Sequence, residues 1–94
     1  MIMFGNFLRA KREAKGMTLQ QVSTALGATN RQNFWNSEMG KNYASSATLK
    51  TVAELLGVSF EELVIRKYLD RIGRDIPSMT EEKLNMALTI LLSV

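Results

Sequence analysis

Apolar residues recur at three- and four-residue spacing from residue 4 to residue 92, and no segment alternates apolar and polar residues long enough to predict a strand. The spacing predicts six helices, over residues 4–15, 18–27, 30–38, 46–56, 59–72 and 81–92. Glycines follow the first five, and Thr18 and Ser59 each begin a capping box. The chain is therefore predicted to be all-α.

Composition excludes most catalytic chemistry. The 94 residues contain no Cys and no His, which removes disulfides, thiolate metal sites and imidazole general bases. The carboxylates Glu61, Glu62, Glu81 and Glu82 occupy first-turn positions, where negative charge favours the helix dipole. We expect a single small domain that is not an enzyme and has no cofactor and no metal.

Charge is distributed unevenly along the chain. Residues 1–58 hold seven Lys or Arg and three acids, a net charge of +4, whereas residues 59–94 hold five and six, a net charge of −1. An anionic partner should therefore bind the first two-thirds of the chain. The longest apolar-rich run, ALTILLSV, is far shorter than the roughly 20 residues that span a bilayer, so no membrane association is expected.

Three segments together resemble a known family. They are FGNFLRAKREAKGMTLQQVSTALG, EMGK and TLKTVAELLGVSFEELV, within residues 4–64. This order resembles the Cro and lambda-repressor-like helix-turn-helix proteins, the XRE family. The resemblance implies a five-helix lambda-repressor-like domain in residues 1–73 and a C-terminal helical extension in residues 74–94.

The function that the resemblance implies is sequence-specific binding of double-stranded DNA. The protein would be a transcriptional regulator, most simply a homodimeric repressor on a palindromic operator with half-sites about one helical turn apart. It would be a cytoplasmic protein, bacterial or phage-encoded, and associated with the nucleoid when bound. The alternative is a protein-interaction adaptor, or an antitoxin or anti-repressor, that uses the same fold. No small-molecule effector is expected.

Family positions also imply residue roles. Phe34 matches the buried anchor of the reading helix, and the residues expected to contact base edges are Arg31, Gln32, Trp35 and Asn36. Arg can bond guanine bidentately, and Gln or Asn can bond adenine in the same way. The residues expected to contact phosphates are Thr18 and Gln20, through backbone N–H groups, and Asn33, Lys41, Asn42 and Tyr43. Arg12 and Glu38 match a structural ion pair.

Two departures from the family pattern leave the direction of the Trp35 side chain open. The turn before the reading helix is one residue longer, which we place in residues 28–30. Ser37 stands where the family has a bulky apolar residue. Trp35 could therefore contact DNA, or it could turn inward and fill the space that Ser37 leaves.

The last predicted helix has apolar residues at heptad-like spacing. We interpret its stripe, Leu84, Leu88, Leu91 and Leu92, as a dimer interface, because the pattern of the core is already complete at Leu63. The alternative is that the helix folds back on the core.

Overall fold

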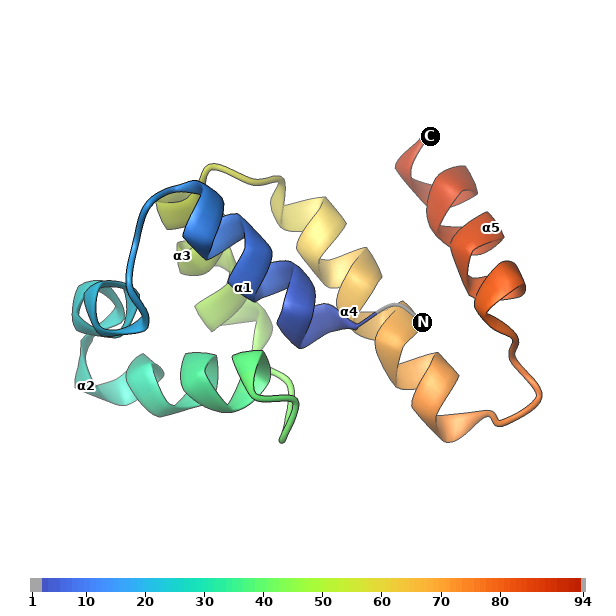
Figure 1. The fold of residues 1–94 in the computed structure, drawn as a ribbon, viewed down its shortest axis with the longest axis horizontal. Coiled ribbons are helices and arrows are strands. Elements are labelled where there is room, and N and C mark those ends of the chain that lie inside the picture. The colour runs from blue at the N-terminus through green and yellow to red at the C-terminus, as the bar shows by residue number, and fades with distance from the viewer. Residues whose placement is uncertain (1–2, 94) are drawn as a thin grey trace.

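The computed structural model describes the backbone of residues 3–93 and the side chains of residues 3–27 and 31–93. Its helices are α1 (Phe4–Ala14), α2 (Leu19–Glu38), α3 (Ser46–Leu56), α4 (Phe60–Asp75) and α5 (Glu81–Leu92), and residues 3–93 contain no strand. α2 is two helices joined at Gly27, whose φ of 81° and ψ of 172° are not helical. Figure 1 shows its two halves running in different directions. The all-α prediction is confirmed, with six helices when the halves are counted separately.

Helix starts follow the predicted capping chemistry. The Thr18 hydroxyl accepts from the Gln21 N–H at 3.1 Å, and the Gln21 side chain accepts from the Thr18 N–H at 2.8 Å. Ser45, Ser59 and Thr80 cap the three helices that follow. The backbone of residues 28–30 is already helical, so the second half of α2 begins before the predicted Asn30, whose side chain lies outside the described residues.

The main core lies between α1, α2, α3 and α4. Its largest buried side chains come from all four helices, and both halves of α2 contribute to it. They are Phe4, Leu8, Val22, Phe34, Leu49, Val52 and Leu63. Since Val22 and Phe34 lie on either side of Gly27, the kink brings both halves of α2 onto one core.

α4 is longer than predicted, because Gly73 does not end it. The helix continues to Asp75, so the predicted boundary between residues 73 and 74 falls inside a helix. A Cβ atom at Gly73 would lie 2.8 Å from Cδ1 of Leu84. The glycine therefore permits close packing of α5 instead of terminating α4.

α5 folds back beside α4 and forms a second, smaller core with it (Figure 1). Leu84 and Leu69 are buried there, and Leu88 is half-buried against them. The prediction that Leu84 belongs to a dimer interface is therefore wrong, since the extended α4 covers it, whereas Leu88 is covered only in part and its role in an interface stays a prediction. Leu91 and Leu92 stay 46% and 41% exposed.

Candidate functional site

The second half of α2 has one buried and one exposed side. Phe34 and Ser37 are buried against the core, as the family pattern implied for Phe34. Arg31, Gln32, Trp35 and Asn36 all lie on the opposite side, where Asn36 is half-buried and the other three are exposed. We call these four residues the reading face.

Two amides of the reading face are bonded to each other. Gln32 Nε2 donates to Asn36 Oδ1 at 3.0 Å, one turn along the helix. The bond orients both side chains and leaves the Gln32 carbonyl oxygen and the Asn36 amino group directed to other partners. An acceptor and a donor are thus held side by side on an exposed surface.

Trp35 does not turn inward to fill space at Ser37. Its side chain is 45% exposed. The space beside Ser37 is closed by α1, because a Cβ atom at Gly5 would lie 2.7 Å from the Ser37 carbonyl oxygen and 2.6 Å from that of Glu38. The small pair Gly5 and Ser37 brings two helix backbones together where a bulky residue would separate them.

A groove of about 430 Å³ lies between the two halves of α2. Its lining combines an apolar wall with polar and cationic groups and consists of Leu19, Gln20, Ser23, Arg31 and Trp35. The groove joins the reading face to the start of α2, so the kink at Gly27 shapes a surface that neither half could form alone.

The ion pair that the resemblance implied, Arg12 with Glu38, is present and largely buried. Arg12 NH2 lies 2.7 Å from Glu38 Oε1, and Arg12 NH1 donates to the Met17 carbonyl at 2.8 Å. The hydrogen bond with Glu38 raises the pKa of Arg12 above its ordinary value. Removing one partner would leave an uncompensated buried charge at a cost of about 3–5 kcal/mol. These contacts join the end of α2 to α1 and to the segment before Thr18.

The residues predicted to bind phosphate are not equally placed. Side chains of Gln20, Asn33, Lys41 and Asn42 are exposed on or beside α2. The Thr18 N–H, in contrast, already donates to Gln21 within the capping box. The prediction for the Thr18 N–H is therefore wrong, because the cap that begins the helix uses this donor.

Tyr43 is also wrongly assigned to phosphate. Its hydroxyl donates to Asp70, and its ring lies 6.3 Å from that of Phe4. Burial, followed by the hydrogen bond with Asp70, raises the pKa of Tyr43 well above its ordinary value. Tyr43 is thus a packing residue of the loop after α2.

Asp70 is the centre of a network that sequence reasoning missed. It is 2% exposed, and it accepts the Phe4 N–H at 2.7 Å and Arg74 Nε at 2.6 Å in addition to the Tyr43 hydroxyl. Arg74 NH1 also donates to the Gly40 carbonyl at 3.2 Å. The spacing of Asp70 and Arg74 indicates only a local helix pair, so no sequence signal pointed to partners elsewhere in the chain.

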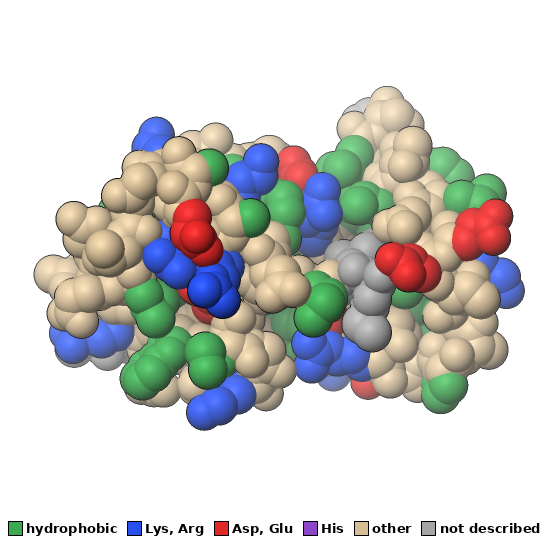
Figure 2. All heavy atoms as spheres, in the orientation of Figure 1, with side chains coloured by type: hydrophobic (Ala, Val, Ile, Leu, Met, Phe, Trp, Pro, Cys, Tyr) green, Lys and Arg blue, Asp and Glu red, His purple; other side chains and the backbone are tan. Residues whose placement is uncertain are grey.

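Acidic side chains are scarce around α2. Residues 14–53 contain Lys15, Arg31, Lys41 and Lys50 but a single acid, Glu38, which Arg12 neutralises. Figure 2 shows Lys and Arg side chains over the part of the molecule that holds α1–α4, with a few acidic ones among them, and acidic side chains next to hydrophobic ones over α5. The part of the molecule that carries the reading face is therefore the part that suits an anion.

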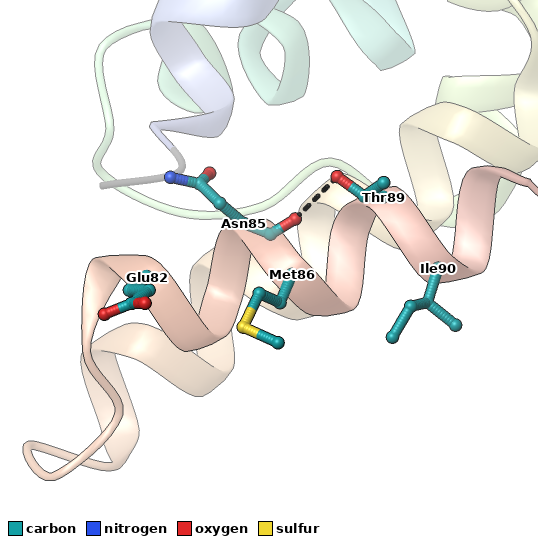
Figure 3. A pocket seen from close by; sticks show the side chains of 5 residues that line it. All are labelled: Glu82, Asn85, Met86, Thr89 and Ile90. Carbon is teal, nitrogen blue, oxygen red and sulfur yellow. Dashed lines mark hydrogen bonds between the residues drawn. The ribbon is translucent and has the colours of Figure 1, made fainter.

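α5 presents a shallow surface of its own. An open pocket of about 460 Å³ is lined only by residues of this helix, Glu82, Asn85, Met86, Thr89 and Ile90. Met86 and Ile90 project from the same side of α5, and Thr89 Oγ1 donates to the Asn85 carbonyl (Figure 3). The exposed side chains of Met86, Ile90, Leu91 and Leu92 make α5 the most apolar exposed part of the described chain.

No protein-family model, curated protein or solved structure matches the chain. Among the residues described, no helix combines the length and the apolar character needed to cross a membrane. The same residues contain no group of three or more acidic side chains placed to hold a metal ion.

Proposed function

We propose that this chain is a sequence-specific double-stranded DNA-binding regulator, most simply a repressor that blocks promoter DNA by occupying it. The observation that carries the proposal is the reading face, four polar or aromatic side chains on one exposed side of a helix that Phe34 anchors. The major groove is about 12 Å wide and admits one helix, so side chains on that side could contact base edges.

Each residue of the proposed interface has a chemical role. Arg31 would bond O6 and N7 of a guanine, and the paired amides of Gln32 and Asn36 would bond an adenine. Lys41 and the exposed Asn33 would contact phosphates on either side of the groove. The ion pair of Arg12 and Glu38 would fix the register of the helix without contacting DNA.

The charge distribution supports an anionic partner at this face. Glu38 is the one acid in residues 14–53, and its charge is paired. A duplex that approaches α2 would therefore meet no unpaired carboxylate from this stretch, while Arg31 and Lys41 would each displace counterions from it.

A homodimer forms the second part of the proposal. One module of this size covers about 600–1,000 Å² of DNA-facing surface, and a palindromic operator accommodates two. The exposed apolar residues of α5 would bind a second copy. Because α5 and α2 lie at opposite ends of the 38 Å long axis (Figure 1), such a dimer favours half-sites more than one helical turn apart, a wider spacing than the resemblance implies.

Light scattering tests the dimer. The wild-type chain is expected at twice its monomer mass, and Ile90→Glu is expected to be monomeric because it places a charge in the apolar surface. Thr51→Glu, at an exposed position of α3 away from α5, is the matched control for the added charge. A monomeric wild-type chain would contradict the dimer and leave DNA binding to be judged separately.

One observation favours an adaptor as the second candidate. Trp35 is half-exposed beside Leu19, and exposed aromatic rings next to apolar walls are common in protein interfaces. In that case the chain would bind another protein through the same groove, as an adaptor, an antitoxin or an anti-repressor.

Selection from random duplexes distinguishes the two candidates. If the chain reads DNA, wild-type protein enriches one sequence, Arg31→Ala relaxes the preference at one position, and Lys41→Ala weakens all duplexes alike and lowers the salt slope by about one. Lys83→Ala, which removes the same charge from α5, should change neither. Equal and weak binding to every duplex at physiological salt would contradict the proposal.

A further inference from the structure

We propose that Arg31 and Trp35 together read a guanine and a thymine that lie one or two base pairs apart, with Trp35 selecting the thymine through its methyl group. This inference rests on the proposed function, since it assigns the base preference of the same surface. The resemblance places Trp35 among the residues expected to contact base edges but assigns it no particular base.

The two side chains share one wall of the groove in α2. Arg31 and Trp35 are separated by one helical turn, and both line the pocket of about 430 Å³ with Leu19. Arg31 is exposed and forms no ion pair with any described residue, and Trp35 is 45% exposed. A guanidinium and an apolar ring are thus both directed to solvent at the same place.

The spacing of Arg31 and Trp35 along the helix matches the spacing of neighbouring base pairs. Four residues of helix rise about 6 Å, and stacked base pairs are about 3.4 Å apart. If Arg31 bonds a guanine, the ring of Trp35 would meet the major-groove edge of a base one or two pairs away. Both side chains would then contact bases without any change of helix direction.

Base chemistry decides what Trp35 would prefer. In the major groove thymine presents a methyl group, cytosine presents an amino donor, and purines present polar atoms. The apolar surface of Trp35, extended by the half-buried Leu19, complements only the methyl group. On binding, the half-exposed ring of Trp35 would contact the thymine methyl group in place of solvent.

Deoxyuridine provides the test, because it differs from thymidine only in lacking that methyl group. After wild-type protein has selected its preferred duplex, each thymine is replaced singly by deoxyuridine. One replacement, within two pairs of the guanine that Arg31 reads, should weaken binding about fourfold, the effect of one buried methyl-sized group. Trp35→Ala should bind the thymidine and deoxyuridine duplexes equally.

Matched variants show which side chain produces each base preference. Arg31→Ala should lose preference for the guanine and keep the thymidine-to-deoxyuridine ratio, and Trp35→Phe should keep part of that ratio. Thermal unfolding of each variant checks the fold. If Trp35→Ala proves unfolded, Trp35→Gln, which places a polar group on the exposed surface, replaces it.

The outcomes separate the inference from the proposed function. Failure of wild-type protein to enrich any sequence would contradict DNA reading itself. An enriched site in which no deoxyuridine weakens binding, or in which Trp35→Ala retains the wild-type ratio, would overturn the role of Trp35 alone.

Discussion

Replacing Gly5 with alanine tests how closely α1 packs on the end of α2. Alanine in a helix is normally favoured over glycine by about 1 kcal/mol. At Gly5, however, the added Cβ would lie 2.6 Å from the Glu38 carbonyl oxygen and 2.7 Å from the Ser37 carbonyl oxygen. Both atoms belong to the backbone of α2, so relief requires a helix to move.

The magnitude follows from these two opposing effects. Forcing an extra group into a packed interface costs about 1–3 kcal/mol, and contact with backbone atoms favours the upper part of this range. After the gain in helix propensity, Gly5→Ala should lower the free energy of unfolding by about 1–2 kcal/mol. The ion pair between Arg12 and Glu38 crosses the same interface, so a shift of α1 would also disturb the position of the reading face.

Gly73→Ala is the matched control. Its Cβ would meet Cδ1 of Leu84 at 2.8 Å, and this atom is the end of a side chain that can rotate. The clash is therefore cheaper to relieve, and the gain in helix propensity offsets it. We expect the free energy of unfolding to remain within about 1 kcal/mol of the wild-type value.

Urea unfolding followed by circular dichroism measures both variants. The slope of the free energy of unfolding against urea concentration should stay unchanged, so that the midpoint alone reports stability. The reasoning would be refuted if Gly5→Ala were as stable as the wild-type protein, or if Gly73→Ala lost more stability than Gly5→Ala.

Three further predictions follow from single buried contacts. Ser37→Ala should raise the free energy of unfolding by about 1 kcal/mol in urea titration, because the buried Ser37 hydroxyl has no hydrogen-bond partner among the described residues; a clear loss would contradict this. The pKa of Tyr43 is raised by burial, so its contribution to stability is complete below its ordinary value of about 10 and is lost as the pH rises through the folded pKa. In Tyr68→Phe, where Tyr43 is the remaining tyrosine, the phenolate absorbance should therefore appear at higher pH in the folded chain than in urea, and equal midpoints would refute the burial. Leu84→Ala should cost about 2–4 kcal/mol and speed hydrogen exchange in α5, whereas Leu92→Ala, from a more exposed position, should cost less than about 1 kcal/mol.

Local signals predicted the helices well. The capping hydroxyls of Thr18, Ser59 and Thr80 lie at helix starts, and the bounds of the helices over 46–56 and 81–92 agree with prediction. These signals succeed because a cap is satisfied by backbone groups only three residues away. The prediction that Gly73 ends its helix was wrong. Glycine can end a helix or permit close packing of another one, and the neighbouring sequence does not distinguish the two.

Side-chain partners were harder to predict than helices. The pair of Arg12 and Glu38 was expected only because the family pattern implied it. Tyr43 instead bonds Asp70, which lies 27 residues further along the chain, and nothing near either residue indicates the contact. Phosphate contact requires an exposed Tyr43, whereas the fold brings Asp70 of α4 against its hydroxyl.

The sequence by itself determined where most helices begin, which residues are apolar anchors and which stretch lacks acids, because these depend on neighbouring residues and on composition. The tertiary structure alone decided that Trp35 faces solvent, that Gly5 and Ser37 bring α1 onto α2, and that α5 packs on α4 through Leu84. Each of these depends on the shape of a surface contributed by a distant segment. Such surfaces exist only after the helices have packed.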